Sequence, residues 1–196
     1  ITLDSPVKPQ KEPRVDVLSA GSAEHVRSAA SALLRSVVGE IPDTARTILY
    51  APTWRDGAPD PAVPTAEEWI RIVRVLEEHD AVLFVRSHPL GEGGYAPPLP
   101  SRRVHALGAA SLPDVTPALA AFDVLVTDYS SLAYDVRLLR MPVLFLAPDA
   151  EEYARIRGFY GRYDDVAGPD AATDWAELLA QLEALLEDTA AHDAAS

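Results

Sequence analysis

Five short runs of apolar residues recur along this chain of 196 residues, and polar or turn residues close each run. The runs are unbroken, as in strands buried on both faces, whereas strands with one solvated face alternate apolar and polar residues. Stretches with apolar residues at helical spacing lie between the runs. Strands that alternate with helices are joined by right-handed crossovers and form a parallel sheet. We therefore expect an α/β fold: a Rossmann-like, doubly wound parallel sheet of about five or six strands.

The predicted elements leave one domain with short extensions at both ends. The predicted strands cover residues 47–51, 81–85, 103–107, 123–127 and 142–146. The predicted helices cover residues 23–38, 65–79, 113–122, 130–140, 149–157 and 173–187. Gly39 follows the first helix at a position where glycine commonly ends helices. We expect a Rossmann-like domain over residues 21–190, a proline-containing connector over residues 1–20, and a tail over residues 191–196.

Composition and motif content exclude several classes of function. The net charge is −13, which argues against a nucleic-acid partner and against binding of this portion to an anionic leaflet. There is no cysteine, so disulfides and thiolate metal sites are excluded. No apolar run approaches the length of a membrane span. The sequence has no Walker motif, GxGxxG, GxSxG or metal-ligand cluster, and we expect no metal and no cofactor.

Polar residues gather directly after the predicted strands. In an open parallel sheet, ligands bind beyond the carboxyl ends of the strands, near the point where the strand order reverses. These ends all lie on one edge of the sheet. We therefore expect one cleft to be lined by Arg55, His88, Ser130, Ser131 and Arg157.

Each candidate residue has a functional and a structural interpretation. The segment 127–131 opens a predicted helix, whose N–H groups and dipole favour an anion, but Asp128 or Ser130 could simply cap that helix. Arg55 and Arg157 suit phosphate oxygens, or they form ordinary ion pairs. His88, beside Arg86, could donate to a phosphate or carry a proton, or it is a surface histidine in a turn. Glu151 and Glu152 could accept hydrogen bonds from ribose hydroxyls, or they are solvated residues at a helix N-terminus. Trp54 and Tyr129 could stack on a base, or they pack against the protein.

Four segments of the chain form a recognisable set. They are Ile48-Leu49-Tyr50-Ala51-Pro52-Thr53-Trp54-Arg55-Asp56; Arg86-Ser87-His88-Pro89; Val126-Thr127-Asp128-Tyr129-Ser130-Ser131 with Asp135; and Glu152-Tyr153 with Arg157-Gly158-Phe159-Tyr160. In this order and spacing they resemble the C-terminal half of the CDP-glycerol glycerophosphotransferase family, which contains the teichoic-acid polymerases and primases. The segment Pro13-Arg14-Val15-Asp16-Val17-Leu18 resembles the one that joins the two halves of such proteins.

The resemblance implies a fold, a reaction and partners. The family has a GT-B architecture, in which two Rossmann-like domains face a cleft and the C-terminal one holds a CDP-activated donor. The implied reaction transfers glycerol phosphate from CDP-glycerol, or a related CDP-alditol, to a hydroxyl of a polyol-phosphate or glycolipid acceptor in teichoic-acid-type biosynthesis. The N-terminal half of the same protein is an implied partner, so we expect this chain alone to be inactive. We expect a cytoplasmic protein, peripheral on the inner face of the membrane through other parts.

The resemblance also implies roles for individual residues. The histidine of the family's Arg-x-His-Pro motif matches His88, which is implied to be catalytic or to bind the diphosphate. The residues implied to bind substrate are Thr53, Arg55, Arg86, Thr127, Asp128, Ser130, Ser131, Glu152 and Arg157. Two alternatives stay open. One is a sugar-nucleotide glycosyltransferase or epimerase of the same architecture, against which the segments 127–131 and 157–160 count, and the other is a nucleotide-binding module without turnover.

Overall fold

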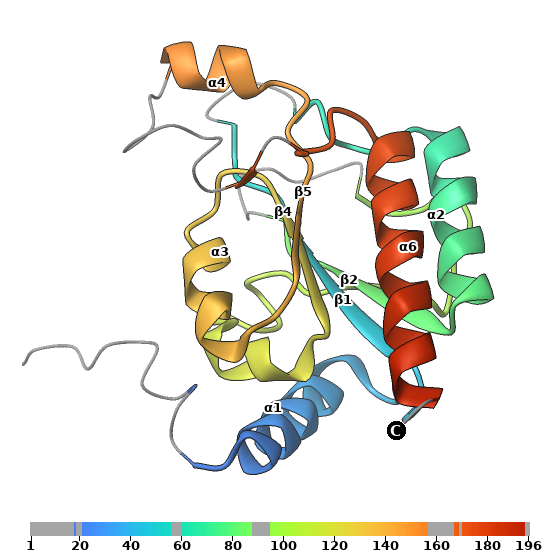
Figure 1. Cartoon of the computed structure of the whole chain (residues 1–196), viewed down its shortest axis with the longest axis vertical. Coiled ribbons are helices and arrows are strands. Elements are labelled where there is room, and N and C mark those ends of the chain that lie inside the picture. The colour runs from blue at the N-terminus through green and yellow to red at the C-terminus, as the bar shows by residue number, and fades with distance from the viewer. Residues whose placement is uncertain are drawn as a thin grey trace, which may run out of the picture.

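One parallel sheet of five strands forms the centre of the structure (Figure 1). This computed structural model describes residues 18, 21–55, 60–87, 95–156, 167–168 and 170–194. The strands are β1 (Arg46–Ala51), β2 (Ala81–Val85), β3 (Val104–Ala106), β4 (Val124–Thr127) and β5 (Val143–Phe145). Their order across the sheet is β3-β2-β1-β4-β5, and every neighbouring pair is parallel. The predicted α/β class, with a Rossmann-like doubly wound parallel sheet, is confirmed.

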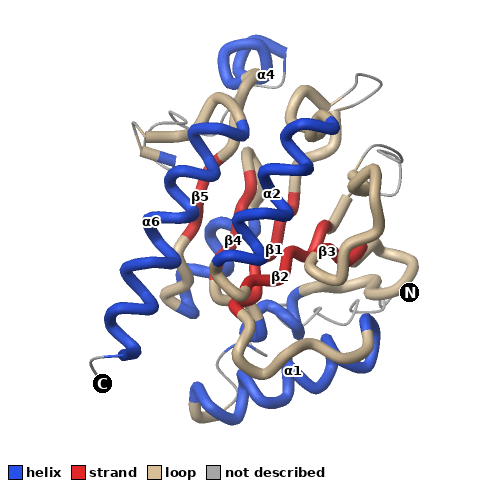
Figure 2. Tube along the Cα trace, turned by 90° about the vertical axis from the view of Figure 1, so that its right-hand side faces the viewer, coloured by secondary structure: helices blue, strands red, loops and turns tan. Residues whose placement is uncertain are grey.

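Helices cover both faces of the sheet. The described helices are α1 (Ala23–Val38), α2 (Ala66–Glu78), α3 (Leu132–Asp135), α4 (Ala150–Ile156) and α6 (Trp175–Ala194), with the 3-10 helices η2 (Thr116–Ala121) and η3 (Val136–Leu139). Helix α4 lies beyond one end of the sheet (Figure 1). Helices α2 and α6 lie side by side on one face (Figure 2). Residues of α1, η2 and η3 pack on the other face.

The alternate side chains of β1, β2 and β4 divide between two hydrophobic cores. In β1, Ile48 and Tyr50 pack with residues of α2 and α6, whereas Leu49 and Ala51 pack with residues of α1 and η2. All four side chains are buried, as the unbroken apolar run predicts. This burial on both faces holds the strand ends in place and so fixes the geometry of the edge where they end.

Local sequence explains where the long helices begin and end. Thr65 accepts a hydrogen bond from the N–H of Glu68 while the Glu68 side chain accepts one from the N–H of Thr65, so a capping box starts α2. Helix α1 has the predicted bounds and ends at Gly39, whose φ of 87° suits glycine. Helix α6 continues to Ala194, beyond the predicted end at residue 187.

Two predicted helices were wrong in type or continuity. The segment 113–122 contains only the six-residue 3-10 helix η2, with a proline in its first turn. The predicted helix 130–140 consists of the four-residue α3 and the 3-10 helix η3. It stops at Arg140, which has a left-handed φ of 54°, because Pro142 disfavours a helical conformation at Met141.

The topology places the reversal of strand order between β1 and β4. From β1 the chain crosses to β2 and β3 on one side, and it then returns to β4 on the other side of β1. Crevices in doubly wound sheets form at this position, beyond the carboxyl ends of the two strands. Residues 52–55 and 128–131 follow these two ends directly.

Two further predictions concern the start of the chain and membrane-spanning segments. The predicted connector over residues 1–20 lies outside the described residues except for Leu18, which is buried beside α1. None of the described helices is both long and apolar enough to cross a membrane.

Candidate functional site

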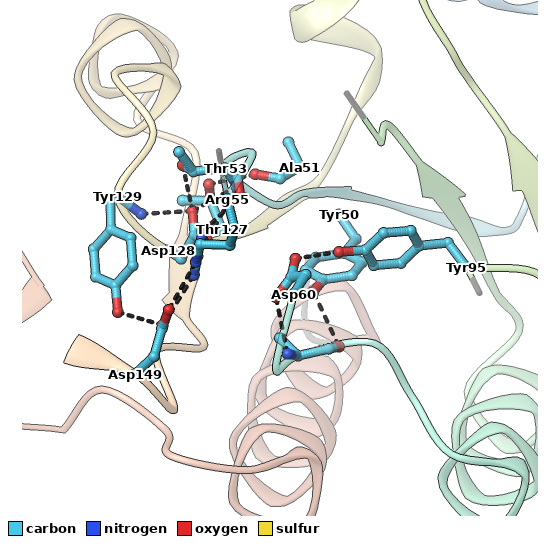
Figure 3. Close-up of polar contacts among 11 residues, drawn as sticks. Tyr50, Ala51, Thr53, Arg55, Asp60, Tyr95, Thr127, Asp128, Tyr129 and Asp149 are labelled. Carbon is cyan, nitrogen blue, oxygen red and sulfur yellow. Dashed lines mark hydrogen bonds and ion pairs between the residues drawn. The ribbon is translucent and has the colours of Figure 1, made fainter. Parts of the chain in front are cut away.

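Arg55 is the centre of a polar cluster at the carboxyl ends of β1, β4 and β5 (Figure 3). Its Nε and Nη2 atoms donate to the two carboxylate oxygens of Asp149, at 2.7 and 2.9 Å. Its Nη1 atom donates to Asp128 at 2.9 Å and to the Thr53 carbonyl at 2.5 Å. These bonds use four of the five N–H donors of the guanidinium. The structure therefore shows the ion pair that was one interpretation of Arg55.

Asp128 joins β4 to the loop after β1. Its carboxylate accepts hydrogen bonds from the N–H of Thr53, from the Thr53 hydroxyl at 2.6 Å and from the N–H of Tyr129 at 2.6 Å. The side chain is only 2% exposed. Burial raises the pKa of Asp128, although Arg55 and the hydrogen bonds oppose this effect. These contacts with Thr53, Tyr129 and Arg55 connect the end of β4 to the loop after β1.

Asp149 completes the cluster, and the sequence did not suggest it as a site residue. Besides Arg55 it binds the Tyr129 hydroxyl, which donates to it at 2.9 Å. Burial raises the pKa of Asp149, but the hydrogen bonds from Arg55 and Tyr129 outweigh this and hold the pKa below its usual range. The sequence contained one signal for Asp149. It follows the last predicted strand, so it was expected on the same edge as Arg55, whose guanidinium needs a carboxylate partner when it is buried.

Two tyrosines cover the guanidinium. The rings of Tyr129 and Tyr153 stack with their centroids 3.9 Å apart, at an angle of 21°. The Arg55 Cζ atom lies 4.9 Å from the Tyr129 centroid and 5.2 Å from that of Tyr153, within the range of a cation–π interaction. Tyr129 therefore packs against protein, as its structural interpretation proposed.

Ser130 and Ser131 lie at the surface of this edge, between β4 and α3. The Ser130 hydroxyl accepts from the N–H of Leu132 at 3.3 Å, whereas Ser131 is the N-cap of α3 and makes no side-chain cap. None of the described residues accepts a hydrogen bond from the N–H of either serine. The four-residue α3 contributes a smaller dipole than the predicted longer helix would. An anion here would depend on the N–H and hydroxyl groups of the loop.

Thr127 and Arg86 are occupied by contacts within the fold. Thr127 is fully buried, and its hydroxyl donates to the Ala51 carbonyl at 2.7 Å. The Arg86 guanidinium donates to the carbonyls of Leu112 at 2.8 Å and Pro113 at 3.0 Å. Burial lowers the pKa of Arg86, although Asp114 opposes the shift. The two side chains support neighbouring strands and the loop between β3 and η2.

Glu152 lies in a different setting, on α4. The side chain is exposed, and its Oε1 atom lies 3.7 Å from Nη2 of Arg155. Glu152 also lines an open pocket of about 860 Å³. Asp149 and Thr173 line the same pocket, which therefore adjoins the Arg55 cluster. The predicted site residues His88 and Arg157 lie outside the described residues. Across the described parts of the chain, no group of three or more His, Asp or Glu side chains is placed to hold a metal ion.

A second polar contact lies on the same edge, close to β1 (Figure 3). The Tyr95 hydroxyl donates to Asp60, and the Tyr50 hydroxyl donates to the Ala62 carbonyl at 3.3 Å. The Tyr50 and Tyr95 rings meet edge to face with centroids 5.9 Å apart. These contacts join the loop after β1 to the loop after β2.

The fold and the position of the polar cluster define a class of protein. A doubly wound parallel sheet with loops from β1 and β4 meeting at its switch point is a Rossmann-like domain, a class whose ligands bind at that point. Comparison with known proteins gives the family. The chain belongs to the CDP-glycerol:poly(glycerophosphate) glycerophosphotransferase family, whose model matches residues 11–195. The family resemblance predicted from the sequence is confirmed.

Named relatives agree with this assignment. The chain is 31% identical to a teichoic acid glycerol-phosphate primase of Bacillus subtilis (strain 168), over 70% of this chain and 35% of that protein. It is 29% identical to the teichoic acid ribitol-phosphate polymerase TarK of Staphylococcus aureus (strain NCTC 8325 / PS 47), over 81% of this chain and 30% of that protein. A solved structure of a variant of the wall teichoic acid polymerase TagF, soaked with CDPG, matches with a TM-score of 0.65 and 29% identity. That match covers 87% of this chain and 41% of the solved chain, so this chain spans well under half of each relative.

Proposed function

We propose that this chain is the donor-binding domain of a transferase that moves glycerol phosphate from CDP-glycerol to a hydroxyl of a teichoic-acid-type polymer. One observation carries the proposal: a chain of this family presents the Ser130–Ser131 loop at the switch point of its sheet. The N–H groups of this loop have no acceptor among the described residues. Free N–H groups at such a position bind phosphate oxygens.

The candidate residues divide into two groups in this proposal. Ser130 and Ser131 contact the donor's diphosphate, together with His88 and Arg157. Glu152 accepts from the ribose hydroxyls in the open pocket beside α4, where its exposure leaves the carboxylate accessible. The other implied substrate-binding residues form the floor and walls of the site, and they are Thr53, Arg55, Arg86, Thr127 and Asp128.

The reaction follows from a donor held in this way. The acceptor hydroxyl oxygen attacks the β-phosphorus of CDP-glycerol in line with the bond to CMP. The new O–P bond forms as the bond to CMP breaks, the acceptor loses its proton, and CMP leaves with the bonding electron pair. Loop N–H groups, His88 and Arg157 stabilise the charge that builds on the phosphoryl oxygens and on CMP.

The rest of the protein supplies the other requirements. The relatives are more than twice as long as their matched regions, which supports a second, N-terminal half that faces this domain in a GT-B architecture and brings the acceptor. We also propose that the protein works in the cytoplasm, peripheral on the inner face of the membrane through parts outside this chain.

The 196-residue chain is expected to bind CDP-glycerol, CDP-ribitol and CDP weakly, and to bind UDP-GlcNAc more weakly still. Calorimetric titration of the four ligands measures this order. With donor and a polyol-phosphate acceptor present, the chain should release no CMP, because the acceptor-binding half is required for transfer.

Two results would contradict the proposal. Tighter binding of UDP-GlcNAc than of CDP-glycerol would favour a sugar-nucleotide enzyme of the same architecture. Release of CMP by this chain would show that the second half is not needed for the reaction.

A further inference from the structure

We propose that Asp149 is a positioning residue of the donor site, which orients the Ser130–Ser131 loop through Arg55 and Tyr129. The inference rests on the proposed function, because it concerns how the same site holds the donor's diphosphate. Asp149 is placed away from that loop in the sequence, at the start of the segment after β5. Its contacts nevertheless reach both of the strands that form the switch point.

Asp149 is tied to β1 and β4 by one buried guanidinium. Arg55 binds both oxygens of Asp149 and also binds Asp128, so three successive strand ends of the sheet are connected. The side chains of Arg55, Asp128 and Asp149 are 7%, 2% and 14% exposed. A fork of two parallel N–H···O bonds fixes direction as well as distance, so the start of α4 cannot shift relative to β1 without breaking bonds.

Tyr129 carries this restraint to the serine loop. Its N–H donates to Asp128 and its hydroxyl donates to Asp149, so both ends of the residue are held. The Tyr129 ring, which lies between its N–H and its hydroxyl, also stacks on the ring of Tyr153. Ser130 follows Tyr129 directly, and the direction of its N–H depends on how Tyr129 is held.

The negative charge of Asp149, taken alone, would weaken the binding of a diphosphate. Two carboxylates share one guanidinium, so the cluster has a formal charge of −1 when both are ionised. A net negative charge beside a diphosphate repels it. The gain in donor affinity from the hydrogen bonds of Asp149 therefore has to exceed the loss from its charge. If the charge is removed, loss of the hydrogen bonds predicts weaker binding of the donor, whereas loss of the repulsion predicts tighter binding.

The substitution Asp149→Asn separates these effects. We expect it to raise the Kd for CDP-glycerol about tenfold, the loss typical when a supporting hydrogen-bond partner of a binding group is changed. Tyr129→Phe, which keeps the ring and removes only the hydroxyl, should raise the Kd by about threefold. The double variant should bind no more weakly than Asp149→Asn alone, because both changes break the same contact. Calorimetry on the folded variants measures all four constants.

Asp123 provides a matched control at the opposite edge of the sheet. Like Asp128 it accepts from an arginine, a threonine N–H and a threonine hydroxyl, here those of Arg27 and Thr47. Asp123→Asn should leave the Kd unchanged.

Unchanged or tighter binding by Asp149→Asn would overturn the inference, and so would additive losses in the double variant. If Asp149→Asn does not fold, Tyr129→Phe decides, since a wild-type Kd in that variant overturns the inference too. Failure of the unsubstituted chain to bind CDP-glycerol is a separate result, and it would overturn the proposed function and this inference together.

Discussion

Replacing Arg55 with methionine is expected to lower the free energy of unfolding by about 3–5 kcal/mol, the cost of removing one partner from a buried ion pair. Methionine fills a similar volume but leaves Asp128, which is 2% exposed, without its guanidinium. A buried carboxylate that loses its cation keeps the full cost of its desolvation. Urea unfolding at pH 7 measures the effect.

The pH dependence of the same variant identifies the cause. Burial already raises the pKa of Asp128 in the presence of Arg55, and removal of the guanidinium raises it further. A group whose pKa is higher in the folded state binds its proton more tightly there, so the folded state gains stability as the pH falls through that pKa. The deficit of Arg55→Met should therefore be smaller at pH 5 than at pH 7, and adding Asp128→Asn should recover part of it.

A control pair shows what an exposed contact contributes. Arg103 binds Asp80 at 2.6 Å, but the two side chains are 25% and 46% exposed. Arg103→Met should cost less than about 1 kcal/mol, as is usual for surface pairs. An equal cost for Arg55→Met and Arg103→Met, or a deficit of Arg55→Met that does not change with pH, would be inconsistent with a buried charge network around Arg55.

The second large effect concerns the rate of transfer by a complete protein that contains this chain. If His88 donates to the donor's diphosphate as charge builds on CMP, His88→Ala should lower kcat about a hundredfold, or by roughly 3 kcal/mol, and change KM far less. Ser130→Ala should have a smaller effect, because the backbone N–H groups of the loop remain. Steady-state assays of CMP release separate kcat from KM.

His105 is the control for the His88 experiment. It lies in β3, at the far side of the sheet from β5, and its ring stacks on Phe84 with centroids 5.4 Å apart. His105→Ala should leave kcat unchanged. A folded His88→Ala protein with wild-type kcat would instead indicate that His88 is a surface residue in a turn, whose replacement changes stability by only about 0.5 kcal/mol.

The sheet could be predicted from the sequence because burial on both faces leaves a local signal. The run of apolar residues from Ala81 to Val85 coincides with β2. Strands β3, β4 and β5 lie within their predicted ranges, and β1 begins one residue before its predicted range. Helix α1 was predicted to the residue, since Gly39 marks its end. The predicted helix 130–140 failed because apolar spacing cannot distinguish a continuous helix from a short α-helix followed by a 3-10 helix.

The edge on which the candidate residues lie was predictable, whereas the hydrogen-bond partner of each side chain was not. Because the carboxyl ends of parallel strands meet at one edge, Arg55 and Ser130 were expected on the same edge, and both lie there. The contact of Arg55 with Asp149 joins residues 94 positions apart and depends on the strand order, which the sequence did not give. Thr127 illustrates the same limit, because only the register of β1 and β4 shows that its hydroxyl binds the Ala51 carbonyl.

The most direct test of the donor site is an NMR titration of the ¹⁵N-labelled chain with CDP-glycerol. We expect the amide signals of Ser130 and Ser131 to shift with increasing ligand, since their N–H groups lie at the proposed diphosphate position. The amides of Thr47 and Asp123, at the opposite edge, should not shift. Shifts confined to Thr47 and Asp123, or no shift at Ser130 and Ser131 at saturating CDP-glycerol, would contradict a donor site at the carboxyl edge of this sheet.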